Sequence, residues 1–211
     1  FEDYQDTNHR YLACTPVLKP STEAAKPAEI DDLLAVIETW GWQHPDIAPK
    51  LVIGWLACAV VCGALQWRPH LWITGPKGSG KSTLDKLIAG TLGDLVLDVQ
   101  GGTTEPGLRQ ALNGDAIPVV FDEFEANNPN ARAIIGAARS AASDNMAPVL
   151  KGTPEGRHLT YRLRFMALFS GIIANAENAA DVSRIVFLEL QCRERNEVQR
   201  AKLEKALQRF S

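Results

Sequence analysis

Apolar side chains recur at helical spacing in two stretches near the start of the chain. The first stretch covers residues 28–40, and Gly41 ends it. The second runs from about residue 46 to residue 66 and includes the uncharged run 51–65. Because this run is shorter than the roughly 20 residues that a membrane-spanning helix needs, we expect a buried helix here.

Short apolar strands alternate with helices through the rest of the sequence. The expected strands of the sheet cover residues 70–74, 95–99, 117–121, 164–173 and 185–190. The expected helices cover residues 81–90, 105–112, 130–143 and 194–210. Thr104 is placed to cap the helix at 105–112. This alternation predicts an α/β fold in which helices enclose a mostly parallel sheet.

The same pattern divides the chain into four parts. We expect a linker or arm at residues 1–28, a helical lead-in at 29–67, an α/β core at 68–192 and a C-terminal helix at 193–211. The chain begins with Phe1 rather than Met, so we also expect a segment of a longer protein that carries further domains.

Composition and charge fit a globular domain with a reduced interior. Hydrophobic residues make up 45% of the chain and charged residues 22%, which allows a sizeable core. The net charge of −3 is unevenly distributed, because residues 1–131 carry 9 basic and 17 acidic side chains whereas residues 132–211 carry 13 and 8. A basic second half suits a polyanionic partner, and a solvated mixed-charge surface explains it equally well. The four cysteines show no C-x-x-C spacing, and no signal peptide is visible, so we expect a reducing, cytoplasmic compartment.

One segment matches the G-x-x-x-x-G-K-[ST] pattern of a phosphate-binding loop, and a strand precedes it and a helix follows it. Its glycines let the backbone turn tightly and direct amides at phosphate oxygens, while the helix adds its positive dipole end. We expect Lys81 to bind the β- and γ-phosphates of ATP and the Ser82 hydroxyl to ligate Mg²⁺. The expected nucleotide-binding residues are Gly75, Pro76, Lys77, Gly78, Ser79, Gly80, Lys81, Ser82 and Thr83.

Two adjacent carboxylates follow a buried strand. We expect this strand beside the strand at residues 70–74, which leads into the phosphate-binding loop (P-loop). The carboxylates are Asp122 and Glu123, at the carboxyl end where α/β sheets place their ligands. We expect Asp122 to hold the metal through water and Glu123 to polarise the attacking water. A pair of this kind favours hydrolysis over transfer of the phosphoryl group to a small molecule.

Two further residues are candidates for sensing or stabilising the γ-phosphate. The apolar run 165–173 is expected beside the strand of Asp122, and a polar residue at its end would lie near the phosphate. Asn175 is the first choice and Ser170 the second, and each could equally be a strand-end cap. Arg184, just before the last strand, either reaches ATP in a neighbouring subunit or pairs locally with Asp181.

A basic hairpin is expected around the turn at residues 152–156. Lys151 and Arg157 flank this turn and could touch the phosphates of a nucleic-acid backbone, or the hairpin could be a charged edge defended against aggregation. Arg132 and Arg139 share one helix face, where a solvated surface and an interface are both possible.

The order of these features resembles that of superfamily 3 helicases within the AAA+ ATPases. The phrases WRPH at 67–70, TEPGLRQ at 104–110 and DAIPVVFDE at 115–123 also resemble the ATPase portion of phage and prophage primase-helicases. The similarity spans roughly residues 50–192. It implies a ring, usually hexameric, that hydrolyses ATP between subunits to move along single-stranded DNA in a bacterial host cell.

The resemblance carries over unevenly to individual residues. Lys81, Ser82, Asp122 and Glu123 match without gaps, whereas Arg184 and Lys151 match by position and order only. No primase or zinc element is present in this sequence. Two other functions stay open: a P-loop kinase for small molecules, which the adjacent carboxylates disfavour, and an assembly module that binds ATP but turns it over little.

Overall fold

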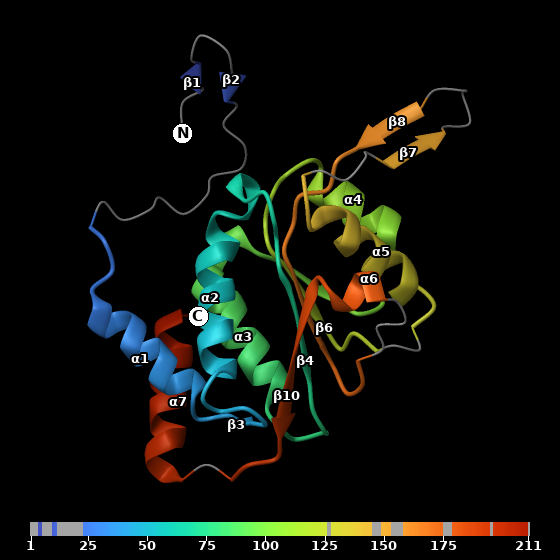
Figure 1. The fold of residues 1–211 in the computed structure, drawn as a ribbon. Helices are drawn as coiled ribbons and strands as arrows, with labels where there is room; N and C mark the ends of the chain where they lie inside the picture. The colour runs from blue at the N-terminus through green and yellow to red at the C-terminus, as the bar shows by residue number, and fades with distance from the viewer. Residues whose placement is uncertain are drawn as a thin grey trace.

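A six-stranded sheet forms the centre of the computed structural model, which describes residues 4–5, 10–11, 23–125, 128–144, 149–152, 158–174, 179–194 and 196–210 (Figure 1). Its strands, in spatial order, are β5 (Leu97–Gln100), β6 (Val119–Asp122), β9 (Ala167–Gly171), β4 (His70–Thr74), β10 (Ile185–Gln191) and β3 (Gly41–Trp42). The first five are parallel, and β3 pairs antiparallel with the end of β10. The expected α/β fold with a mostly parallel sheet is confirmed.

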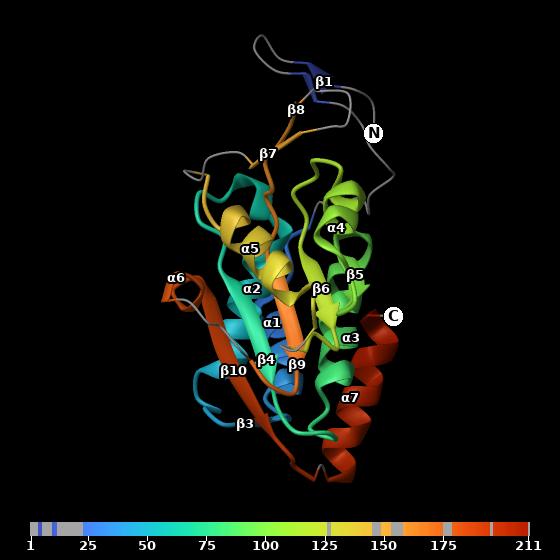
Figure 2. The ribbon, with the colours of Figure 1, turned by 90° about the vertical axis from the view of Figure 1, so that its right-hand side faces the viewer.

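Helices cover both faces of this sheet, as Figures 1 and 2 show. One face carries α1 (Pro27–Ile37), α2 (Ala48–Val60), α3 (Lys81–Leu92) and α7 (Glu197–Phe210). The other face carries α4 (Glu105–Leu112) and α5 (Ala131–Ala141), with the short α6 (Ala179–Val182) beside α5. Side chains alternate between the two cores along each strand: Ile73 packs with α3, and Trp72 packs with α5.

The order of the strands corrects one expectation. We predicted that the strand of Asp122 lies beside the P-loop strand, but β9 lies between β6 and β4. The long connection from β6 to β9 allows the chain to return to the centre of the sheet, and periodicity along one strand carries no information on which strand becomes its neighbour. The expected pairing of β9 with β6 is confirmed.

Several helix boundaries also differ from the expected ones. The second helix ends at Val60, and a 3₁₀ turn (Cys62–Ala64) replaces its last expected residues. Arg68 explains this break, because its buried guanidinium donates hydrogen bonds to the carbonyls of Cys62 and Leu65. Thr104 caps α4 as expected, accepting a hydrogen bond from the Gly107 amide at 3.2 Å. No helix in the described part of the chain combines the length and apolar character that a bilayer span requires.

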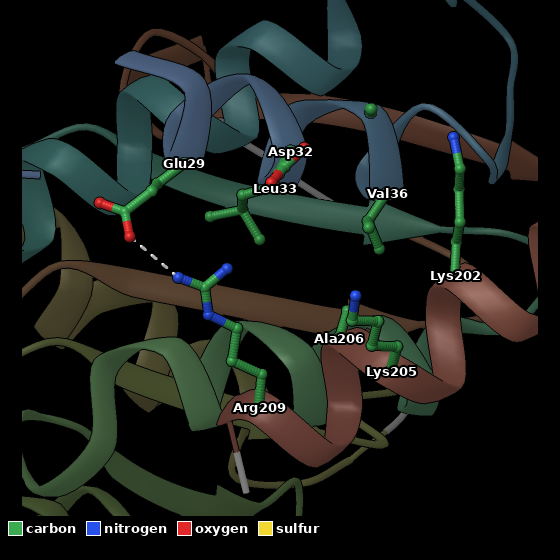
Figure 3. Close-up of a pocket in the computed structure, with 9 residues that line it drawn as sticks. Glu29, Asp32, Leu33, Val36, Lys202, Lys205, Ala206 and Arg209 are labelled. Carbon is green, nitrogen blue, oxygen red and sulfur yellow. Dashed lines mark hydrogen bonds and ion pairs between the residues drawn. The ribbon is translucent and has the colours of Figure 1, made fainter. Parts of the chain in front are cut away.

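The lead-in helices share the core of the sheet. Val36, Trp40 and Trp55 belong to the same apolar cluster as Ile73 and Leu84. Helices α1 and α7 lie side by side at its margin, with an opening of about 230 Å³ between them (Figure 3). An ion pair of 3.1 Å between Glu29 and Arg209 spans that opening. The expected boundaries at residues 28, 67 and 192 stay predictions.

Two hairpins lie outside the main sheet. The β1–β2 pair is formed by Tyr4–Gln5 and Arg10–Tyr11, and the β7–β8 pair by Val149–Gly152 and His158–Tyr161. The second pair corresponds to the expected basic hairpin. It enters β9 from its amino end, so it extends beyond the amino edge of the sheet, as Figures 1 and 2 show.

A buried histidine joins the elements at this amino edge. His70 Nδ1 accepts a hydrogen bond from the Ala167 amide at 2.9 Å, and Nε2 lies 2.8 Å from the Ala138 carbonyl oxygen, to which it therefore donates. Complete burial lowers the pKa of His70 to about 4, so the ring is neutral. The sequence phrase at 67–70 thus has a structural function: Arg68 and His70 bind β4 to its surroundings.

The loop after β6 is enclosed by two glycines. A methyl group on Gly171, at the end of β9, would lie 2.3 Å from the Phe124 carbonyl oxygen, and one on Gly101, after β5, would lie 2.2 Å from the Glu123 carbonyl oxygen. The Phe124 amide also donates to the Ser170 carbonyl at 2.7 Å. Backbone therefore meets backbone on both sides of this loop, and only glycine permits that approach.

We predict that Gly171→Ala lowers the free energy of unfolding by about 2–3 kcal/mol, because the added methyl group must displace backbone. Gly54→Ala is the matched control. Gly54 lies within α2 with nothing near its missing side chain, so alanine should raise the free energy of unfolding by roughly 0.5–1 kcal/mol. Urea unfolding of both variants measures the difference, and equal effects would contradict the close approach at Gly171.

Candidate functional site

A cavity of about 600 Å³ opens at the carboxyl edge of the sheet, where β4, β6 and β9 end. Three segments far apart in the sequence form its wall: the loop between β4 and α3, the loop after β6, and the end of β9. Its lining residues are Lys77, Gly78, Gly80, Lys81, Ser82, Thr83, Asp122, Glu123, Glu125, Ser170, Gly171 and Ile172. Most of the residues expected from the sequence to bind nucleotide and metal therefore meet in one place.

The loop between β4 and α3 has the backbone of an anion-binding loop. Gly78 and Gly80 adopt positive φ values of 85° and 89°, and Gly80 is the N-cap of α3. Lys81 Nζ donates to the carbonyls of Gly75 at 2.6 Å and Pro76 at 3.2 Å, which holds the ammonium over the loop. The buried Ser79 hydroxyl has no hydrogen-bond partner. The loop thus offers a cation and amides at a helix N-terminus.

The carboxylate of Asp122 lies beside the first turn of α3. The Ser82 hydroxyl is 3.5 Å from Asp122 Oδ1, and the Glu123 amide donates to the same oxygen at 2.9 Å. Glu123 itself has a φ of +53°, a conformation that is unusual for a residue with a side chain. The enclosed loop after β6 explains how the chain maintains this geometry, which turns Glu123 toward the cavity rather than continuing the strand.

Only one of the two expected sensor residues is within the described part of the chain. Ser170, the second choice, lies in β9 and lines the cavity, and its buried hydroxyl is a neighbour of the Asp85 carboxyl group. Asn175, the first choice, falls outside the described residues. Sequence reasoning missed Glu125, whose carboxylate accepts a hydrogen bond from the Ile172 amide at 3.0 Å and joins the two loops. The sequence signal that could have identified Glu125 is its position shortly after Asp122 and Glu123.

A buried carboxyl group lies directly behind the site. Asp85, one turn after Lys81 in α3, is only 3% exposed, and the Ser170 hydroxyl is a polar neighbour of its carboxyl group. Burial raises the pKa of Asp85 to about 7; the Ser170 hydroxyl lowers it in part, and the charges of Asp122 and Asp98 raise it further. The pKa of Asp98 is also raised, first by burial and then by Asp122. Burial and the neighbouring carboxylates therefore both favour the neutral, protonated form of Asp85.

Arg184, the arginine expected to act on phosphate, lies away from the cavity. Arg184 is at the amino end of β10, where its guanidinium donates to the Ala180 carbonyl at 2.5 Å and lies 5.5 Å from the centre of the Trp67 ring. The five residues of β4 separate this edge from the cavity by about 16 Å, so Arg184 does not reach the P-loop of its own chain. Asp181, its expected local partner, lies 3.4 Å from Arg139.

The structure describes only some of the other residues singled out from the sequence. Lys151 lies in β7, where the structure describes the backbone alone, and Arg157 is outside the described residues. Arg132 is exposed on α5. Cys58, Cys62 and Cys192 are free thiols, of which Cys62 is buried and Cys192 is exposed rather than part of the core, and Cys14 is outside the described residues.

The cavity is large enough for a small-molecule ligand, and its lining includes oxygens that could hold a metal ion. Its volume lies within the roughly 300–1,000 Å³ typical of ligand pockets. Among the described residues no group of three or more His, Cys, Asp or Glu side chains could hold a metal. Mg²⁺ does not need one, because it is commonly bound by one or two protein oxygens together with phosphate oxygens and water. Ser82 and Asp122 supply such oxygens side by side.

Fold and site together define a P-loop NTPase-like α/β domain, and comparison with known proteins adds to this. No protein-family model and no curated protein match the chain. Among solved structures, the apo A form of the NrS-1 C-terminal region matches with a TM-score of 0.50 and 14% identity, over 98% of this chain and 50% of that one. A structure of JCV helicase gives 0.48 and 14%, over 85% and 52%. The chain thus spans about half the length of these structures, and identity this low relates the folds alone.

We predict that Asp85→Asn stabilises the protein in a pH-dependent way. Folded Asp85 keeps its proton up to about pH 7, whereas the unfolded residue loses it above 3.8, so the wild type loses stability as the pH rises between these values. The variant avoids this loss, which is at most roughly 4 kcal/mol above pH 7. Urea unfolding of both proteins from pH 4 to pH 8 measures the gain. His70 titrates equally in both proteins, so its contribution cancels in the difference between their free energies of unfolding. A gain in stability that does not depend on pH would contradict the burial of a charge at Asp85.

Proposed function

We propose that this chain is the ATP-hydrolysing motor domain of a ring-forming DNA helicase, of the superfamily 3 type found in phage replication proteins. One observation carries the proposal: the P-loop, the Asp122–Glu123 pair and the end of β9 converge on a single cavity at the carboxyl edge of the sheet. That combination is suited to the hydrolysis of a nucleoside triphosphate and not only to its binding.

In this proposal the P-loop binds the phosphates. Lys81 exchanges its contacts with the Gly75 and Pro76 carbonyls for the β- and γ-phosphate oxygens, and the amides at the start of α3 bind the rest. Ser82 and Asp122 hold Mg²⁺, which neutralises charge on the phosphates when it is bound. Burial and, to a lesser extent, the charge of Asp122 raise the pKa of Asp85 and of Asp98.

Glu123 then acts on water. Its carboxylate lies next to the metal-binding Asp122 and lines the same cavity, so it can accept a proton from a water that attacks the γ-phosphate. Ser170 is the described residue best placed to contact that phosphate from the neighbouring strand. A small-molecule kinase would instead need space and donors for a second substrate where these carboxylates lie.

Other features of the chain support the ring and the DNA. The distance between Arg184 and the cavity of its own chain favours a role at the nucleotide of a neighbouring subunit. The basic hairpin β7–β8 and the excess of basic residues after position 131 favour a polyanion, and single-stranded DNA is the substrate that the family resemblance implies. The chain spans about half the length of the structures it matches, so the activity of a whole protein is part of this proposal.

We predict that Glu123→Gln binds Mg-ATP with nearly unchanged affinity and hydrolyses it at least about 100-fold more slowly, because the amide cannot accept the proton of the attacking water. Calorimetric titration gives the affinity, and release of phosphate gives the rate. Lys81→Ala is the companion variant and should lose binding itself. Turnover by Glu123→Gln at the wild-type rate would remove Glu123 from this role.

We also predict that single-stranded DNA accelerates ATP hydrolysis by the wild-type protein, because a motor couples ATP turnover to movement along the DNA. The measurement compares the ATPase rate with and without an oligonucleotide, at two salt concentrations, because contacts with phosphates weaken as salt rises. An ATPase rate that does not change when DNA is added would exclude a DNA motor. Mg-ATP binding that assembles the protein without turnover would instead support the assembly module.

A further inference from the structure

A tryptophan from the lead-in segment contacts the P-loop. Trp40 lies in the turn between α1 and β3 and is only 1% exposed. Its indole Nε1 donates a hydrogen bond of 2.9 Å to the carbonyl oxygen of Gly80, which is 40 positions further along the chain. Gly80 is the residue immediately before Lys81, so this contact falls on the backbone expected to bind phosphate.

The peptide that joins Gly80 to Lys81 explains why this contact matters. The peptide is planar and trans, so its carbonyl and its N–H point in opposite directions. The carbonyl points into α3, where it accepts the Leu84 amide at 3.0 Å as well as the Trp40 indole. The Lys81 N–H must therefore point out of the helix, toward the space that a phosphate would occupy. Glycine at position 80 permits many other orientations of this peptide, and two donors on one oxygen restrict them.

The turn that carries Trp40 is itself anchored to the sheet. Strand β3 pairs with β10, and the Gln43 amide donates to the Glu189 carbonyl at 2.9 Å. The same stretch of β10 meets the start of the P-loop, since a methyl group on Gly75 would lie 2.5 Å from the Leu190 carbonyl oxygen. The end of β10 thus contacts both the lead-in turn and the P-loop, and Trp40 joins the two directly.

We propose that Trp40 is a positioning residue of the nucleotide site, and that docking of the α1–β3 turn and binding of Mg-ATP stabilise one another. This inference rests on the proposed nucleotide-binding function of the P-loop. The lead-in segment then belongs to the nucleotide site, although its sequence carries no nucleotide-binding motif. Because coupling of this kind is reciprocal, bound nucleotide must also hold the turn more firmly.

The chain offers a matched control for the test. Trp42 is also buried, and its indole Nε1 donates a hydrogen bond of 2.8 Å to the Ile37 carbonyl, within the lead-in segment and away from the P-loop. Trp40→Phe and Trp42→Phe therefore each remove one indole hydrogen bond from a similar environment. Only the first variant removes a bond to the P-loop.

The experiment measures the dissociation constant of Mg-ATP by calorimetry, and the urea unfolding of each protein. We expect Trp40→Phe to weaken Mg-ATP binding about fivefold to tenfold, the effect of one lost hydrogen bond. Trp42→Phe should destabilise the fold to a similar extent and leave the dissociation constant unchanged. Equal dissociation constants in the wild type and Trp40→Phe, or equal weakening in both variants, would overturn the inference. A wild-type protein that binds no Mg-ATP would overturn the proposed function as well.

A second measurement serves if Trp40→Phe does not fold. Hydrogen exchange of the wild-type amides at residues 39–43 is followed with and without Mg-ATP. We expect Mg-ATP to slow exchange in this turn at least severalfold. The amides of the β7–β8 hairpin, at the opposite edge, should not change. Protection of the P-loop without protection of the turn would overturn the coupling while leaving nucleotide binding intact.

Discussion

Contact between backbones on both sides of the loop after β6 is the constraint on which the site depends. Gly101 and Gly171 let the loop lie against the ends of β5 and β9, and this contact fixes the carbonyls of Glu123 and Phe124. A positive φ at Glu123 is maintained because the surroundings leave no alternative. Asp122 can then face Ser82 while Glu123 faces the cavity. Two adjacent carboxylates in a regular strand would instead point to opposite faces of the sheet.

The site contains buried polar groups that cost stability. Asp85 and Ser170 are buried polar groups that interact with each other, and the buried Ser79 hydroxyl has no hydrogen-bond partner. Buried polar groups are normally paired, and unpaired ones gather where a ligand or a metal completes them. The same arrangement explains the raised pKa of Asp85, since a carboxylate there is opposed by both burial and the charge of Asp122. Buried polar groups at the first turns of α3 therefore lower the stability of the fold at the position where the proposed chemistry takes place.

The two edges of the sheet have different compositions. The carboxyl edge holds the P-loop, the carboxylates and the end of β9. The amino edge holds Arg184 and the entry to the basic hairpin, together with the buried pair Arg68 and His70 that fixes β4. A strand length separates them, so nothing at the amino edge can act on the nucleotide of its own chain. A second subunit would bring the two kinds of edge together, which is the physical basis for the proposed ring.

The sequence by itself determined the elements and the local chemistry. The spacing of glycines around Lys81, the cap at Thr104 and the bounds of β4 all follow from interactions between residues close in the chain. The tertiary structure alone decided which elements are neighbours. It placed β9 between β4 and β6, assigned Glu125 to the site with Asp85 behind it, put Arg184 at the opposite edge and brought Trp40 to Gly80. The reason is physical: local hydrogen bonding and periodicity act over a few residues, whereas these contacts join segments whose meeting depends on the packing of the whole sheet.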